Sequence, residues 1–169
     1  DALRDLGIYL NYNGYGAEVA DLHLPPDALF RRLQPYANPL DFIHLDPAFG
    51  QLRDGFDEDM ARARAITPEI DGPGHRLHLL PAAPWARRAG GVLANELARS
   101  APDQAHALLT RLPAEGFVVS VRAPLSNRLG ADDLCRRFPG GGGRPAAAGI
   151  NQLDDSDYDA FVAAFLAAF

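Results

Sequence analysis

Apolar residues in the first 65 positions recur at steps of three and four, which is the spacing of amphipathic helices. Prolines interrupt this pattern repeatedly, so most of the predicted helices are short. Asn38-Pro39 and Asp46-Pro47 each place a capping side chain before a proline, which is typical of a helix start. The predicted helices span residues 2–10, 25–33, a short stretch beginning at 39, and 48–64.

The pattern changes after residues 67–74, where prolines and glycines predict a linker. Short apolar and β-branched runs, typical of strands, now alternate with helical spacing. Strands are predicted at 77–80, 105–112, 117–121 and 146–150, and helices at 84–100, 131–138 and 156–169. A tight connection at 114–116 indicates a hairpin between the second and third strands. We therefore predict an α/β chain, with a helical segment plus linker over 1–72 and a domain with a central mixed sheet over 73–169.

The chain has 169 residues, of which 47% are hydrophobic and 22% charged, as in ordinary globular proteins. No apolar run approaches the roughly 20 residues that a membrane helix needs, so no membrane-spanning segment is predicted. The first residue is Asp1 and the only methionine is Met60, so we expect a piece of a longer polypeptide. The single cysteine, Cys135, excludes an internal disulfide and is interpreted as a buried apolar residue. This cysteine usage predicts a cytoplasmic location.

The formal net charge of −6 argues against avid, sequence-independent binding to duplex DNA, but is compatible with a compact anionic ligand. All sixteen basic residues are arginines, which we attribute mainly to coding bias, although the guanidinium fork suits phosphate. Arg87-Arg88 and Arg136-Arg137 are interpreted as solvated helix faces. The second pair is also a candidate for extending a phosphate path.

Four consecutive glycines, residues 140–143, predict a loop in which the backbone approaches another group closely or takes positive φ. Successive backbone N–H groups in such a loop bind anions. A plain flexible loop is the alternative for an isolated glycine run. Neither of two standard phosphate motifs is present: no Lys-Ser/Thr follows these glycines, and Gly14-Tyr15-Gly16 lacks the third glycine of a dinucleotide fingerprint.

The glycines continue into a longer motif that resembles the DHHA1 domain, the C-terminal substrate-binding module of the DHH phosphoesterases. The family pattern Gly-Gly-Gly-His-x-x-Ala-Ala-Gly is matched by Gly141-Gly142-Gly143-Arg144-Pro145-Ala146-Ala147-Ala148-Gly149, and a Ser-x-Arg strand end by Ser120-Val121-Arg122. The resemblance covers about 76–169. Arg144 replaces the family's histidine; it keeps an anion contact but cannot relay a proton at neutral pH.

The resemblance implies a phosphate-binding site. Its expected members are Arg122, Gly141, Gly142, Gly143 and Arg144, with Ser120, Asn13 and Tyr15 as further candidates. For Asn13 and Tyr15 a structural role in their loop is an equally open interpretation. We expect no catalytic residue and no metal ligand in this chain, and interpret the pairs Asp21/His23, His44/Asp46 and His75/His78 as surface or packing residues.

The function implied is that of the C-terminal part of a metal-dependent phosphoesterase acting on nucleotides, short oligonucleotides or polyphosphate. No Asp-His-His signature occurs in the sequence, so the divalent metal, manganese by resemblance, is expected in an absent DHH half, and this chain alone is expected to be inactive. The partners expected are the substrate and that DHH half, with oligomerisation open. The alternative is a tRNA-binding module like the C-terminal domain of alanyl-tRNA synthetase, although the prolines exclude the long helix that precedes that module.

Overall fold

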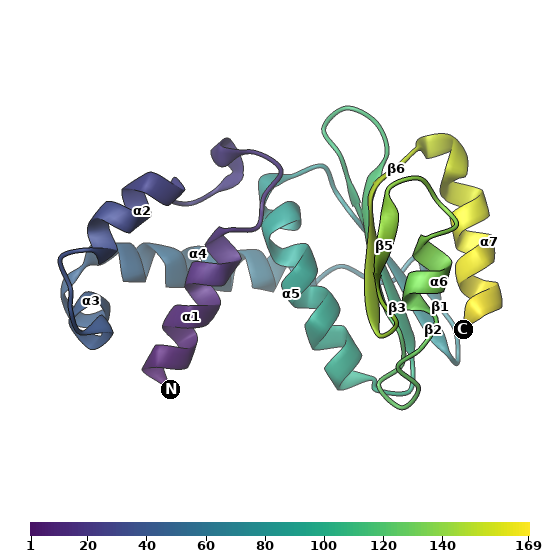
Figure 1. The fold of residues 1–169 in the computed structure, drawn as a ribbon, viewed down its shortest axis with the longest axis horizontal. Coiled ribbons are helices and arrows are strands. Elements are labelled where there is room, and N and C mark those ends of the chain that lie inside the picture. The colour runs from purple at the N-terminus through teal and green to yellow at the C-terminus, as the bar shows by residue number, and fades with distance from the viewer.

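The computed structural model describes residues 1–169, which form a helical first part and a sheet-containing second part (Figure 1). The first part contains α1 (Ala2–Asn13), the 3-10 helix η1 (Val19–Asp21), α2 (Pro26–Leu33), α3 (Pro39–Leu45) and α4 (Pro47–Arg64). The second contains β1 (Ile70–Asp71), β2 (His75–Leu80), α5 (Pro84–Ser100), β3 (Ala105–Arg111), β4 (Phe117–Arg122), α6 (Ala131–Cys135), β5 (Gly141–Arg144), β6 (Ala147–Leu153), η2 (Asp155–Asp157) and α7 (Tyr158–Ala168). The predicted fold class is confirmed. None of these helices combines the length and apolar character needed to cross a membrane.

The predicted proline-capped helix starts are present in α3 and α4. The Asn38 side chain accepts a hydrogen bond from the Leu40 backbone N–H, and Asp46 accepts one from Ala48. Each proline occupies the first helical position, where its missing N–H leaves no bond unmade.

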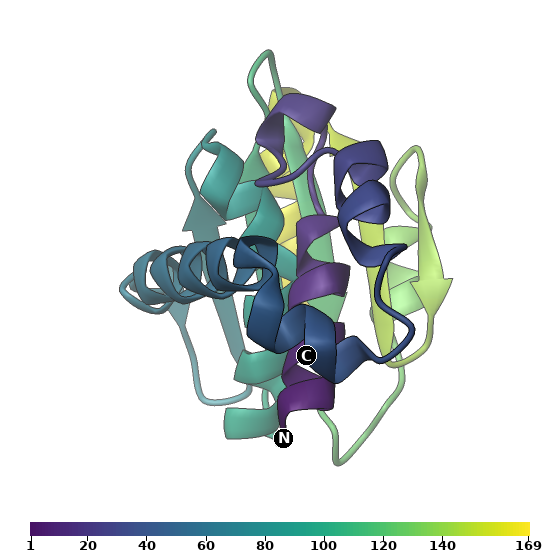
Figure 2. The same ribbon diagram turned by 90° about the vertical axis from the view of Figure 1, so that its left-hand side faces the viewer.

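The six strands form one mixed sheet in the order β1-β2-β3-β4-β6-β5. Only β2 and β3 run parallel; every other neighbouring pair is antiparallel, including the predicted β3–β4 hairpin. Helix α5 covers one face of the sheet, and α6 and α7 cover the other (Figure 1). Helices α1–α4 lie beyond α5, on the side that faces the viewer in Figure 2.

The helical part and the sheet are joined by a shared core. One apolar cluster packs Met60 and Ala63 of α4 with residues of α5 and with Leu80 and Leu108 of the sheet. A second, larger cluster fills the space between the sheet and α6 and α7, and a third lies among α1–α4. Helix α5 therefore contacts both parts of the chain.

Two predictions need correction. The segment predicted as a linker contains strand β1, which pairs with β2, and Glu69 next to it donates a backbone hydrogen bond to Leu77. Residues 141–144 of the glycine run form strand β5, paired in register with β6, and not a loop, although the predicted positive φ values are present at Gly140 and Gly143. Glycine has a low strand propensity, but β5 is held by its neighbour across the sheet rather than by its own side chains.

Candidate functional site

Two arginines lie in one row across three neighbouring strands. The register pairs Arg122 of β4 with Ala147 of β6, and the same Ala147 with Arg144 of β5. Residues paired in this way point to the same face of a sheet, so both guanidinium groups extend from one face. Two strand spacings place their Cα atoms roughly 10 Å apart. The small side chain of Ala147 leaves the space between them open.

The next row on this face has almost no side chains. It pairs Ser120 with Gly149 and Gly149 with Gly142. Ser120 precedes Arg122 by two positions and therefore shares its face. A hydroxyl and two bare backbone segments thus lie beside the two arginines, which is a surface that a phosphate group can approach closely.

Three of the four positions of the glycine run require glycine, for different structural reasons. Gly140 and Gly143 have φ values of 69° and 150°, which disfavour other residues. A β-carbon on Gly141 would lie 1.9 Å from the Cys135 carbonyl oxygen, so this glycine lets β5 pack against the end of α6. A β-carbon on Gly142 would meet nothing within 4 Å. Backbone conformation explains Gly140, and close packing explains Gly141 and Gly143, but neither explains Gly142.

Beside these rows is a cleft with a volume of about 400 Å³ between α5, the sheet and the loop that follows α1. Ser120 and Arg122 line it from the sheet, and Tyr15 lines it from the loop. The structure therefore brings these three predicted site residues together. Pockets of this size hold small ligands.

Arg122 is half-buried at this cleft and is held in place by its neighbours. Its Nε donates to Asn95 Oδ1 of α5 at 2.9 Å, and Nη1 donates to the Val121 carbonyl at 3.1 Å. Burial lowers the pKa of Arg122, and the positive charge of Arg144 acts in the same direction. An arginine still carries its charge at neutral pH, so two unneutralised cations lie near each other, which favours an anion between them.

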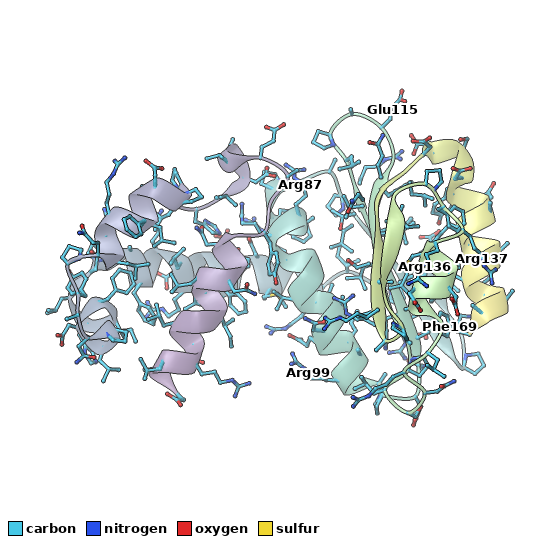
Figure 3. All side chains as sticks on the ribbon, in the orientation of Figure 1. Arg87, Arg99, Glu115, Arg136, Arg137 and Phe169 are labelled. Atoms are coloured by element: carbon cyan, nitrogen blue, oxygen red, sulfur yellow. The ribbon has the colours of Figure 1, made fainter.

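Arg87 lines the same cleft and is not the solvated residue that the sequence predicted. It lies on the first turns of α5, beside the segment from α1 to η1 (Figure 3). Its Nε and Nη2 donate to the two carboxylate oxygens of Asp21, at 2.7 and 2.5 Å. Both side chains are at least nine-tenths buried, and the Arg87 guanidinium lowers the pKa of Asp21 to about 2.

Arg88 was also predicted to be solvated, and it is buried as well. It donates to both carboxylate oxygens of Asp59 and to the backbone oxygen of Asp21. Burial alone would raise the pKa of Asp59, but hydrogen bonds from His23, Arg88 and Tyr12 lower it to about 2. Sequence periodicity missed both arginines because their partners come from the helical part of the chain.

The remaining predicted residues are divided between the cleft and the framework. Asn13 is buried, and its amide donates to the Leu24 carbonyl and accepts from the Leu24 N–H, which is a structural role. Tyr15 is 40% exposed at the cleft, and its hydroxyl accepts a hydrogen bond from Asn11 at 2.8 Å. Asp21 pairs with Arg87, and His23 forms a hydrogen bond with Tyr12. These two residues therefore have the packing role predicted as one of two possibilities.

Arg136 and Arg137 do not extend the phosphate path. They follow α6, which packs on the opposite face of the sheet from α5 (Figure 3). Arg136 is paired there with Asp132 and Asp133. Of the two interpretations of Arg136 and Arg137, the solvated helix face agrees with the structure, because the sheet separates these residues from Arg122.

Several residues of the cleft were absent from the sequence-based prediction, among them Asn95, Thr110, Gly90 and Gly91. Gly90-Gly91 was the one sequence signal that could have indicated them. Each glycine inside a helix costs about 1 kcal/mol relative to alanine, so two adjacent glycines in α5 suggest a packing or binding role. A β-carbon on Gly90 would lie 3.3 Å from Thr110 Oγ1, whereas one on Gly91 would meet open space at the cleft.

The chain offers no cluster of three or more His, Cys, Asp or Glu side chains arranged to hold a metal ion. His75 and His78 belong to one strand, and His78 is buried. The residues present therefore do not fit a divalent metal.

No protein-family model and no curated protein matches this sequence. Among solved structures, RecJ from Thermus thermophilus in complex with Mn²⁺ matches 96% of this chain and 26% of its own, with 16% identity and a TM-score of 0.56. An exonuclease RecJ bound to manganese matches 96% of this chain and 44% of its own, at 16% identity and a TM-score of 0.54. A pGpG-specific phosphodiesterase, PggH from Vibrio cholerae, matches 85% of this chain and 50% of its own, at 17% identity and a TM-score of 0.46.

The chain thus spans between about a quarter and a half of the length of these structures. The chain shares the fold of the matching part of the exonuclease RecJ. The fold that the nine-residue motif predicted is confirmed.

Proposed function

We propose that this chain is the substrate-binding part of a metal-dependent DHH-type phosphoesterase, acting on nucleotides, short oligonucleotides or polyphosphate. The observation that carries the proposal is the row Arg122–Ala147–Arg144, which places two cations beside the bare backbone of Gly142 and Gly149. The shared fold with RecJ supports it.

The proposed role of these residues is to bind and orient a phosphate. Each guanidinium offers a planar pair of donors that matches two phosphate oxygens. The absence of a side chain at Gly142 allows the phosphate to reach the backbone. Arg144 contributes charge but no proton transfer, because an arginine does not lose its proton at neutral pH.

We propose that the divalent metal is held by a DHH domain outside these 169 residues, and manganese is the ion that the resemblance implies. Such an ion supplies a hydroxide nucleophile and neutralises phosphate charge. Since binding without that nucleophile leaves the chemical step unassisted, the purified chain is expected not to hydrolyse a 5′-phosphorylated dinucleotide in the presence of Mn²⁺. Metal-dependent hydrolysis that is lost on mutating the chain's own carboxylates would place the active site here instead.

The phosphate role is tested by titrating a 5′-phosphorylated dinucleotide into the wild-type chain, Arg122→Ala and Arg144→Ala by calorimetry. Each charge-assisted contact contributes about 1.5–3 kcal/mol, so each variant should bind roughly 10- to 150-fold more weakly. Arg137→Ala is the matched control, because it removes an exposed arginine on the opposite face and should bind like wild type. Thermal melting of each variant checks that it folds; Arg144→Ala should change stability by at most about 0.5 kcal/mol.

Equal affinities for all four proteins would contradict the phosphate assignment. The tRNA-binding alternative predicts another pattern: a tRNA stem should bind far more tightly than the dinucleotide.

A further inference from the structure

The loop that follows α1 forms one wall of the cleft but has few backbone contacts of its own. Residues 14–17 line the cleft from this loop, and all four are exposed. Backbone hydrogen bonds join the N–H groups of Gly14 and Tyr15 to the last turn of α1, whereas those of residues 16–18 have no backbone acceptor. The position of this wall therefore depends on side-chain contacts.

The Asp21 carboxylate makes these contacts. Its Oδ2 atom accepts the Ala17 N–H at 2.9 Å and the Glu18 N–H at 3.3 Å. The same atom accepts a hydrogen bond from Arg87 Nε at 2.7 Å, and Oδ1 accepts one from Arg87 Nη2 at 2.5 Å. Gly16 packs so closely that a β-carbon there would lie 3.0 Å from the Asp21 β-carbon. One buried carboxylate thus joins the loop to α5.

Helix α5 also holds the wall that the sheet contributes. Asn95 Oδ1 accepts a hydrogen bond from Arg122 Nε at 2.9 Å. Arg87 and Asn95 both line the cleft and lie eight positions apart in α5, which is roughly 12 Å along a helix axis. Arg88 donates to the backbone oxygen of Asp21 and fixes the same segment to α5. Contacts to one helix therefore set the positions of both walls.

A carboxylate suits the position of Asp21 better than a neutral side chain. An ionised carboxylate has about four lone-pair sites, so it can accept from all of these N–H donors at once. The Arg87 guanidinium holds the pKa of Asp21 at about 2, so the carboxylate is charged at neutral pH. Asp21 itself does not line the cleft. Any effect of Asp21 on a ligand therefore passes through the loop.

We propose that Asp21 is a positioning residue for the candidate site, which holds the loop of residues 14–18 against α5 and so fixes the wall to which Tyr15 belongs. The inference rests on the proposed function, because the ligand has to occupy this cleft for the wall to matter. It assigns a role in binding to a residue that touches no ligand.

The test combines two measurements on Asp21→Ala in the full 169-residue chain. In calorimetry, the 5′-phosphorylated dinucleotide should bind roughly 3- to 30-fold more weakly than to wild type, the range for a residue that acts without touching the ligand. Amide hydrogen exchange should become faster at Ala17 and Glu18, whose N–H groups lose their acceptor, and stay slow in β4. Unchanged exchange at these two amides would overturn the positioning role.

The matched control is Asp46→Ala. Asp46 also accepts a backbone N–H, that of Ala48, and also pairs with an arginine, Arg32. It precedes α4 and does not line the cleft. This variant should lower the melting temperature but leave the dinucleotide affinity and the exchange at Ala17 unchanged.

A second variant keeps the buried ion pair and decides the proposal if Asp21→Ala does not fold. Gly16→Ala places a β-carbon 3.0 Å from both the Asp21 β-carbon and Leu22 Cδ2, which displaces the loop without leaving a buried charge unpaired. It should weaken dinucleotide binding about threefold and speed the exchange at Ala17. Gly7→Ala in α1 is its control and should bind like wild type, because a β-carbon there meets nothing within 4 Å.

The outcomes separate the positioning role from the proposed function. Weaker binding by Arg122→Ala, with wild-type affinity in Asp21→Ala and Gly16→Ala, would overturn the positioning role and keep the phosphate site. Equal weakening by Asp21→Ala and Asp46→Ala would also overturn the positioning role, because the effect would then be one of general stability. Weaker binding by Asp21→Ala with no effect of Arg122→Ala would keep the positioning role and overturn the phosphate site. Failure of the wild type to bind the dinucleotide would overturn both.

Discussion

The two faces of the sheet are built from alternate residues of the same strands, yet they differ sharply. Val119 and Val121 of β4 point into an apolar core that contains Phe161 and Phe165 of α7. Ser120 and Arg122, one position away along the same strand, line the cleft on the other face. One strand therefore supplies stability on one side and the candidate binding groups on the other.

The two faces also differ in their buried polar groups. On the α7 face, His75 Nδ1 lacks a hydrogen-bond partner, and the His75 ring lies beside Phe165. The α5 face holds buried His78 and His106, each with an unpartnered Nδ1, together with the half-buried Arg122. If the division is correct, changes on the first face should affect folding alone, and changes on the second should affect binding or its pH dependence.

The largest effect is expected from Phe161→Ala on the apolar face. Phe161 is fully buried, and truncating such a side chain costs about 3–5 kcal/mol of unfolding free energy. Urea denaturation measures this loss. Leu166→Ala on the same helix is the control: Leu166 is 39% exposed, so about 1 kcal/mol or less should be lost. Similar losses for both variants would mean that α7 does not pack as described.

The next effect is a pH dependence that belongs to the polar face. Burial, followed by the charges of His106 and Arg76, lowers the pKa of His78 to about 4. In the unfolded chain His78 binds a proton near pH 6.5, whereas in the folded chain it stays neutral until about pH 4. Stability should therefore fall as the pH drops from about 6.5 to about 4. The loss is at most about 3 kcal/mol, since one pKa unit corresponds to about 1.36 kcal/mol.

Chemical denaturation between about pH 7 and about pH 4 measures this slope. His78→Gln should flatten it, whereas His44→Gln, at an exposed helix position, should leave it unchanged. Asp21 and Asp59, whose pKa values are lowered to about 2, also lose stabilising charge as the pH falls below about 5, so the variants are compared with wild type above that pH. A slope that persists in His78→Gln would assign the dependence to His106 or to another group.

The smallest of these effects compares two adjacent glycines of β5 that belong to different faces. Gly141→Ala places a β-carbon against the Cys135 carbonyl and should cost about 1–3 kcal/mol. Gly142→Ala points into open space and should change stability by at most about 0.5 kcal/mol. Melting temperatures of the two variants are compared directly. A larger loss for Gly142→Ala would reverse the assignment of the faces.

Local signals predicted much of this fold. The proline-capped helices and the β-branched run of β4 depend on neighbouring residues, which the sequence displays. Strand β5 does not: Gly141–Arg144 has no strand propensity, and its conformation follows from pairing with β6 and contact with α6. The two-residue strand β1 likewise depends on pairing with β2 rather than on its own composition.

The candidate site divides in the same way. Ser120, Arg122 and Arg144 were predicted from a motif resemblance, but the row that aligns them depends on the β4–β6–β5 register. Arg87 was predicted to be solvated because its partner, Asp21, is 66 residues away in the chain. A long-range ion pair produces no periodic pattern in the sequence. The adjacent glycines Gly90-Gly91 are visible in the sequence because glycine is unfavourable inside a helix.

The two edges of the sheet have a consequence for how the protein behaves at high concentration. An exposed edge strand offers free backbone groups to other copies of a chain and promotes aggregation. Here one edge is β1, with only two residues, and the other is β5, with four. Pro73 limits the first edge, while Pro145 and the charge of Arg144 limit the second. The glycine-rich strand that forms part of the candidate site therefore offers a second molecule only four residues of edge, one of them positively charged.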